Sequence, residues 1–161
     1  MKKQLVALGI AAALALPSLT FAEGFDINRM SVGAGINQNS VSGFSNATGF
    51  QIFGGYNFGE VFNAEGLDLR VEAGYWTSGD FKFAGFNAGS ADGIWGTAVF
   101  DYKLNPDFSL LGRAGLDLGD DDGLMIGFGA GWNMTEQVQL RGEYVIRDNI
   151  NSIQLNAVYN F

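Results

Sequence analysis

Charged residues recur in pairs within segments where apolar and polar positions alternate. Arg70 and Glu72 lie two residues apart, and Arg141 and Glu143 repeat this arrangement near the C-terminal end. Two carboxylates such as Glu72 and Glu143 could in principle serve as a general acid and a general base. The neighbouring arginines should keep both carboxylates ionised, so neither is suited to act as a general acid. These residues therefore favour ion pairing over catalysis.

The composition removes most other site chemistry. The chain contains neither histidine nor cysteine, which excludes a Ser–His general base, a thiolate nucleophile and imidazole metal sites. In GFGAG (127–131) the glycines recur at every second residue with no helix after them. They predict small residues on one strand face rather than a dinucleotide site. We expect no enzyme activity and no cofactor.

The acidic segment GDDDG (119–123) offers carboxylate oxygens, which calcium and magnesium prefer. It lacks the spaced ligands and the bidentate glutamate of an EF-hand loop. We predict a solvated hairpin tip at this segment, and weak divalent-cation binding at an anionic lipopolysaccharide surface is the alternative.

The first 22 residues differ from the rest of the chain. A basic start, MKK, precedes the apolar run LVALGIAAALAL and the small-residue ending PSLTFA, which is typical of a secretory signal peptide cleaved after Ala22. The run is shorter than a membrane-spanning helix of about 20 residues, and a retained anchor is the alternative. We predict an exported protein with a signal peptide at 1–22 and one domain at 23–161.

Net charge and hydropathy exclude two further classes of protein. Without residues 1–22 the chain keeps 7 basic and 17 acidic side chains, a net charge of −10. Such a surface would repel nucleic-acid phosphates, so we expect no nucleic-acid partner. No later apolar stretch approaches the roughly 18 residues of a spanning helix, which excludes a helical membrane protein.

The remaining sequence resolves into segments in which apolar residues alternate with polar or small ones. In LDLRVEAGYWT, the clearest case, Leu67, Leu69 and Val71 share one face, while Asp68 and Arg70 share the other. This period of two predicts half-buried strands. The eight segments are 29–37, 50–58, 67–77, 94–104, 108–118, 124–134, 138–147 and 152–161.

The connections between these segments differ at the two ends of the predicted strands. One end has 105–107, 135–137 and 59–66, and the other end has 38–49, 78–93, 119–123 and 148–151. Short turns at one rim and longer loops at the other are typical of outer-membrane barrels, as are aromatic residues near strand ends. A soluble β-sandwich is the alternative. We predict an all-β, antiparallel, up-and-down transmembrane barrel that is monomeric, because a closed barrel leaves no strand edge unpaired.

These features resemble the small eight-stranded outer-membrane barrels of the OmpA/OmpX type. The resemblance rests on the signal peptide, the eight amphipathic segments and the C-terminal LNAVYNF, whose alternating apolar residues end on Phe161. It implies a location in the outer membrane of a Gram-negative bacterium, in contact with lipid and lipopolysaccharide. It also implies that Tyr159 and Phe161 form a recognition signal for the barrel assembly machinery. The family includes adhesins, structural proteins, small channels and enzymes, so the resemblance predicts fold rather than function.

Counting residues from the short-turn end gives each inward-facing side chain a height in the predicted barrel. Six charged side chains fall into one layer, subject to the stagger of the strands; they are Arg70, Glu72, Asp101, Arg113, Arg141 and Glu143. Unpaired charges there would cost several kcal/mol each, so we expect them to pair. We predict a lumen plugged by ion pairs, and a charged constriction that selects small solutes is the alternative.

The longest connection, 78–93, contains FKFAGF, which places Phe81, Phe83 and Phe86 where water is expected. Exposed apolar groups of this kind mark contact surfaces; capping of the barrel mouth and contact with the membrane are the alternatives. We predict a structural or surface-interaction protein that presents 38–49 and 78–93 to an extracellular protein or surface ligand. A narrow passive channel for small polar or ionic solutes is the alternative function.

Overall fold

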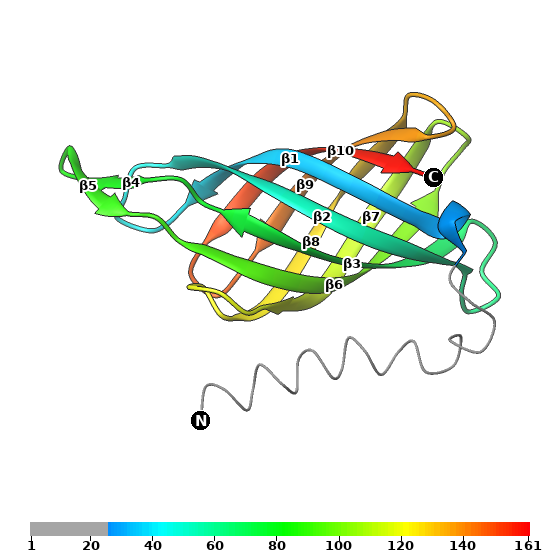
Figure 1. Ribbon diagram of the computed structural model, residues 1–161, viewed down its shortest axis with the longest axis horizontal. Coiled ribbons are helices and arrows are strands. Elements are labelled where there is room, and N and C mark those ends of the chain that lie inside the picture. Colours follow the sequence, from blue (N-terminus) through cyan, green and yellow to red (C-terminus); the bar gives the residue numbers. More distant parts are fainter. Residues whose placement is uncertain (1–25) are drawn as a thin grey trace.

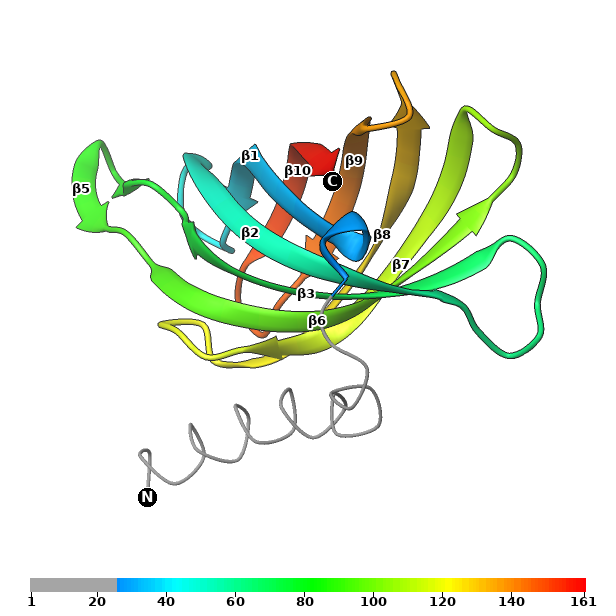
Figure 2. The same ribbon diagram turned by 45° about the vertical axis from the view of Figure 1, so that its right-hand side comes forward.

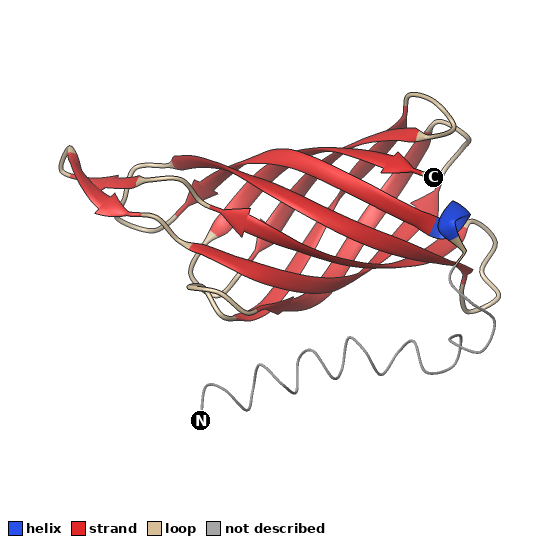
Figure 3. Cartoon of the chain, viewed as in Figure 1, coloured by secondary structure: helices blue, strands red, loops and turns tan. Residues whose placement is uncertain are grey.

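The computed structural model describes residues 26–161, and the predicted signal peptide at 1–22 lies outside the described residues. Within 26–161, eight antiparallel strands form a closed barrel (Figure 1, Figure 3). They are β1 (Met30–Ser40), β2 (Ala47–Glu60), β3 (Leu67–Thr77), β6 (Asp92–Lys103), β7 (Phe108–Asp117), β8 (Gly123–Asn133), β9 (Val138–Ile146) and β10 (Asn151–Asn160). The predicted all-β, up-and-down barrel of eight strands is confirmed. Among the described residues, no helix is long and apolar enough to cross a membrane.

Burial alternates along the strands, with polar side chains on the inside. In β3, Asp68, Arg70 and Glu72 are buried, whereas Tyr75 is exposed on the opposite face. Successive side chains of a strand point to opposite faces, so the period of two in the sequence directs the charged residues into the barrel. The outer face is left to the apolar residues.

The outer face carries an apolar band around the barrel. Large aliphatic and aromatic side chains expose between 42% and 63% of their surface; they include Val32, Ile36, Ile52, Ile94, Leu110, Ile126, Phe128, Ile153 and Leu155. A soluble monomer rarely exposes so extensive an apolar surface. Further exposed aromatic residues, Tyr102, Phe108, Trp132 and Tyr159, gather near the short turns. A lipid environment accounts for this surface.

The barrel closes between its first and last strands. β10 pairs with β1 from Ser31↔Asn160 to Ser40↔Asn151 without a register shift. The backbone N–H of Phe161 continues the pairing by donating to the carbonyl of Met30 at 3.0 Å. Lipid offers no hydrogen-bond partners to the backbone, so this closure is required of a spanning sheet.

A short 3₁₀ turn, η2 (Ile27–Arg29), precedes β1. Asp26 caps it, and its carboxylate accepts hydrogen bonds from the side-chain amide and the backbone N–H of Asn28. These hydrogen bonds lower the pKa of Asp26 because they favour its ionised form.

The segment 78–93, predicted as a loop, contains a further hairpin of two short strands, β4 (Phe81–Phe83) and β5 (Phe86–Gly89). Ala84 and Gly85 form its two-residue turn with φ angles of 49° and 85°, the positive values that a type I′ turn requires. The hairpin projects beyond the ends of the neighbouring strands (Figure 1, Figure 2). This hairpin was not predictable from the sequence, because its strands are too short to show a period and alanine stands where Asn or Asp signals this turn.

Candidate functional site

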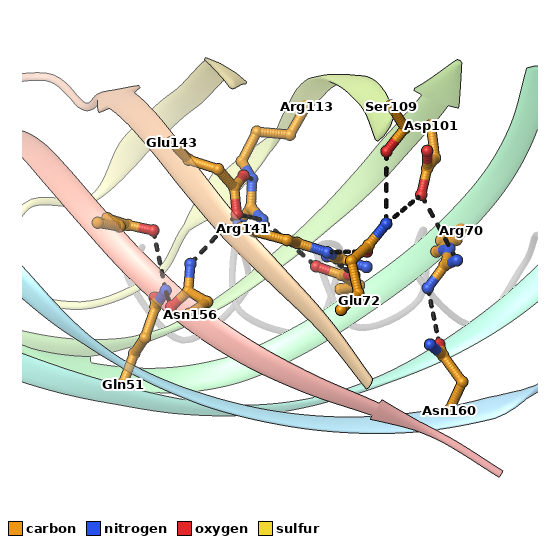
Figure 4. A network of polar contacts seen from close by, with 12 residues as sticks. Gln51, Arg70, Glu72, Asp101, Ser109, Arg113, Arg141, Glu143, Asn156 and Asn160 are labelled. Atoms are coloured by element: carbon orange, nitrogen blue, oxygen red, sulfur yellow. Dashed lines mark hydrogen bonds and ion pairs between the residues drawn. The ribbon is translucent and has the colours of Figure 1, made fainter. Parts of the chain in front are cut away.

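Four of the six predicted lumen charges form a compact cluster. Arg141 Nη1 lies 2.6 Å from Glu72 Oε1. Arg113 lies between two carboxylates, with Nη2 3.4 Å from Glu72 Oε2 and Nε 2.7 Å from Glu143 Oε2. None of these side chains exposes more than 1% of its surface. Strands on opposite sides of the lumen contribute them, so the cluster bridges the barrel from wall to wall (Figure 4).

The other two predicted residues form a pair nearer the short turns. Arg70 Nη2 lies 3.5 Å from Asp101 Oδ2, and Arg70 Nη1 donates a hydrogen bond to Asn160 Oδ1 at 2.9 Å. Gln139 joins this pair to the cluster, because its carbonyl accepts from Arg141 Nε at 2.7 Å and its amide donates to Asp101 at 3.4 Å. The predicted single layer is therefore two connected groups, since the stagger of the strands sets Arg141 opposite Glu72.

One further ion pair lies at each end of the lumen, and its side chains also point inward. At the short-turn end, Lys103 Nζ lies 2.9 Å from Asp68, and the lysine remains half-exposed. Towards the outer loops, Arg147 Nε lies 2.8 Å from Asp117 Oδ2, and its Nη1 donates to Ser152 at 2.8 Å. Every inward-phase charge thus has an opposite partner, which keeps the lumen close to neutral.

Amide side chains line the wall formed by β1, β2, β9 and β10, and they were not among the predicted site residues. Gln51 donates hydrogen bonds to the carbonyl oxygens of Gln154 at 2.8 Å and Asn156 at 2.6 Å. Asn156 in turn donates to Glu143 at 3.2 Å. The amides therefore hold the ion cluster from the side. Their inward phase was visible in the sequence, and it was the signal that could have found them.

Apolar side chains fill the space that the polar network leaves. Those with at most 6% of their surface exposed include Phe53, Trp76, Trp95, Val99, Leu111, Met125, Val145 and Val158. Phe53 packs against Trp95 with ring centroids 5.6 Å apart, and the guanidinium of Arg113 lies 5.3 Å from the centroid of the Trp95 ring. The interior is thus a mixed polar and apolar core, in which Arg113 of the ion cluster packs against the ring of Trp95.

The glycines of GFGAG make room for this core. A Cβ at Gly129 would collide with the carbonyl of Gly142 and with Glu143, and a Cβ at Gly127 would lie 2.9 Å from Arg113 Cγ. Glycine is needed at these two positions because backbone atoms and charged side chains of neighbouring strands approach closely.

The three loop phenylalanines differ in their surroundings. Phe81 is 7% exposed and packs at the barrel mouth in a cluster that includes Trp76 and Ile150. Phe83 and Phe86 are 59% and 78% exposed. The first of the three therefore caps the mouth, and only the other two are placed for contact with a partner.

Acidic side chains of the segment 119–123 accept hydrogen bonds from the neighbouring outer connections. Asp121 is buried and accepts hydrogen bonds from the backbone N–H groups of Asn149 and Ile150. Asp120 accepts from the backbone N–H of Asp92 at 3.1 Å. Within residues 26–161, no group of three or more acidic side chains is arranged to hold a metal ion.

The family model described as the outer membrane protein beta-barrel domain matches residues 6–161. The chain belongs to this family. The barrel therefore lies in the outer membrane, and its apolar band contacts lipid. No curated protein matches its sequence.

Several solved structures share the fold of this outer-membrane barrel. The attachment invasion locus protein Ail of Yersinia pestis is 18% identical, with a TM-score of 0.56 over 82% of this chain and 97% of Ail. The N-terminal barrel of OprF from Pseudomonas aeruginosa is 14% identical, with a TM-score of 0.51 over 81% and 97%. A designed transmembrane barrel is 18% identical, with a TM-score of 0.56 over 81% and 92%. At these identities the likeness extends to the fold alone.

Family membership indicates which end of the barrel faces the periplasm and which faces the exterior. Outer-membrane barrels turn their short connections to the periplasm and their longer loops outward. The hairpin β4–β5 therefore belongs to the outer end. Tyr159 and Phe161 lie at the periplasmic end on the lipid-facing surface, where they are 39% and 48% exposed and their rings meet edge to face.

Proposed function

We propose that this protein is a sealed outer-membrane barrel that acts as a structural scaffold and interacts with partners through its outer loops, 38–49 and 78–93. The observation that carries the proposal is the wall-to-wall cluster of Glu72, Arg113, Arg141 and Glu143. Its charges are paired and fully buried, and buried apolar side chains fill the rest of the interior. An ion that crossed the barrel would have to break these pairs.

The outer loops support the second half of the proposal. A β-bridge joins the first loop to the hairpin, where the backbone N–H of Ser45 donates to the carbonyl of Lys82 at 2.9 Å. Phe81 fixes the hairpin to the barrel mouth from below. A tip that is held in place in this way loses little conformational freedom when it binds a partner.

The proposed partners are of three kinds. An extracellular protein or surface ligand contacts the outer loops, and lipopolysaccharide surrounds the outer half of the barrel. The barrel assembly machinery recognises Tyr159 and Phe161, the signal that the family resemblance implies. The protein acts as a monomer, because the closed strand order uses both edges of the sheet.

Single-channel recording tests the sealed lumen and the channel alternative together. The protein is purified from outer membranes and reconstituted in a planar bilayer, with a porin in the same lipid as the positive control. We expect no conductance steps. Steady, reproducible steps would overturn the scaffold and support a narrow channel for small polar or ionic solutes.

Cell adhesion tests the role of the outer loops. Cells that display the protein are compared, on a serum-coated surface, with cells that display a variant in which a glycine–serine turn replaces 81–89. We expect weaker adhesion of the variant at equal amounts of folded barrel. Equal adhesion would contradict the interaction role.

A further inference from the structure

Three exposed phenylalanine side chains, two on the outer hairpin and one on the adjoining connection between β1 and β2, form one apolar surface, here called the aromatic wall: Phe83, Phe86 and Phe44. Phe44 contacts both Phe81 and Phe83, with ring centroids 6.5 Å and 5.7 Å apart. Phe83 and Phe86 are directly paired across the hairpin, so they lie on the same face. Side chains two residues apart in a strand share a face, which puts the wall on the side of Phe81.

The position of Phe81 shows where the wall is directed. Phe81 belongs to the buried apolar cluster that also contains Trp76 and Ile150, and Ile150 lies in the connection between β9 and β10. The face that carries Phe81 is therefore turned towards the barrel axis. The hairpin extends outward beyond the shorter connections 118–122 and 147–150 (Figure 2), so the wall continues this face away from the membrane.

Exposed acidic side chains lie at the same end of the barrel as the aromatic wall. At the outer end of the described chain, the exposed acids are Asp80, Asp92, Asp120, Asp122 and Asp148. Lys82 is the one exposed base in the same part of the structure, because Arg147 is buried against Asp117. Hydrogen bonds from Asp92 to Asp120 and from Asn149 to Asp121 fix the two lower connections in place. The outer end of the barrel thus carries both the aromatic wall and a set of exposed acidic side chains on hydrogen-bonded connections, here called the acidic rim.

We propose that the aromatic wall and the acidic rim together form a docking surface for a cationic, amphipathic segment of a partner polypeptide. This inference rests on the proposed function and names the chemistry of the partner. Apolar side chains of the segment pack on Phe44, Phe83 and Phe86, while its lysine or arginine side chains lie over Asp120, Asp122 and Asp148. Aromatic residues at the centre of a contact with charges around it are the usual arrangement of binding hot spots.

Charge selects this partner over other macromolecules. Phosphate and sulfate groups of nucleic acid, lipid A or sulfated sugars would be repelled by the rim. A second copy of this chain would bring the same negative rim against it, so self-association is disfavoured as well. A polypeptide with lysine or arginine satisfies both the charge and the apolar surface.

Fluorescence anisotropy with a defined probe tests the inference. The full protein is placed in phosphatidylcholine nanodiscs and titrated with a labelled ten-residue peptide of alternating lysine and leucine. Empty nanodiscs give the lipid background, and a peptide with glutamate in place of lysine tests the charge. We expect saturable binding of the lysine peptide only, weakened as salt screens the rim.

Two variants and their matched controls locate the binding surface. The double substitution Phe83→Ser and Phe86→Ser should weaken binding about tenfold or more, as the loss of hot-spot residues does. Phe62→Ser, at an 80% exposed phenylalanine of the opposite end, should leave affinity unchanged. The neutral triple variant Asp120→Asn, Asp122→Asn and Asp148→Asn should also weaken binding. Its control carries Glu65→Gln, Asp107→Asn and Glu136→Gln at exposed acids near the short turns.

The outcomes separate this inference from the proposed function. Binding no stronger than to empty nanodiscs, equal binding of the glutamate peptide, or equal loss in the control variants would overturn the docking surface. If the planar bilayer shows no conductance steps and the hairpin variant still reduces adhesion, the proposed function stands without the docking surface. Conductance steps would overturn the sealed scaffold whatever the probe does.

Discussion

The guanidinium of Arg147 lies over the indole ring of Trp76, with Cζ 4.2 Å from the ring centroid. Trp76 is fully buried, and the arginine also pairs with Asp117. Replacing Arg147 with Met should destabilise the barrel by about 3–5 kcal/mol, because Asp117 would remain buried without its ion-pair partner. Urea unfolding in lipid vesicles measures this.

Arg147→Lys is the matched control for that variant. It keeps the charge but loses the planar stacking and the second donor, so we expect a smaller loss than for Met. Equal losses for Lys and Met would show that the charge itself contributes little at this position.

Arg113→Ala tests the central cluster. The substitution leaves Glu143 without its ion-pair partner and Glu72 with Arg141 alone, so we expect a loss of about 3–5 kcal/mol of unfolding free energy. Thermal unfolding of the reconstituted barrel measures the effect, with conductance recorded in parallel. Unchanged stability would argue against pairing, and a change in ion selectivity alone would favour a constriction.

Gly129→Ala should destabilise the barrel by about 1–3 kcal/mol, the usual effect of overpacking. The added methyl group would collide with the carbonyl of Gly142 and displace Glu143 from Arg113. Gly112→Ala is the matched control, because a Cβ there meets nothing within 4 Å. The two variants are compared by urea unfolding, and equal midpoints would mean that the lumen has more room than its contacts indicate.

Phe81→Ala and Phe83→Ala compare the buried phenylalanine that anchors the outer hairpin with an exposed phenylalanine of the same strand. Loss of the buried Phe81 removes its contacts at the barrel mouth, and large-to-small changes of buried phenylalanine cost about 3–5 kcal/mol. Part of this loss should appear as faster proteolytic cleavage within 78–93 while the barrel remains folded. Phe83 is 59% exposed, so its variant should be cleaved at the normal rate, and faster cleavage of both would place Phe83 in the anchor too.

The strands were predictable because their signal is local. Asp68, Arg70 and Glu72 alternate with apolar residues, and the predicted segment 67–77 coincides with β3. The burial of Phe81 was not predictable, because it joins an apolar cluster whose other members, such as Ile150, are distant in the sequence.

The pairing inside the lumen was predictable only in part. The residue types and their inward phase identified which charges share the lumen. Which arginine reaches which carboxylate depends on the stagger between strands, a property of the closed sheet rather than of any one segment. The role of Gln139 between Arg141 and Asp101 follows from the same stagger.

The seam between β1 and β10 has a consequence for how the chain folds. Its pairs, from Ser31↔Asn160 to Ser40↔Asn151, join residues more than a hundred positions apart, and contacts of such separation form slowly because a long loop must first be closed. Until β10 arrives, β1 presents an open edge that could pair with another chain. The protein therefore passes through an aggregation-prone stage that ends only when its last strand is in place, and a helper that shields β1 during this interval would determine the yield of folded barrel.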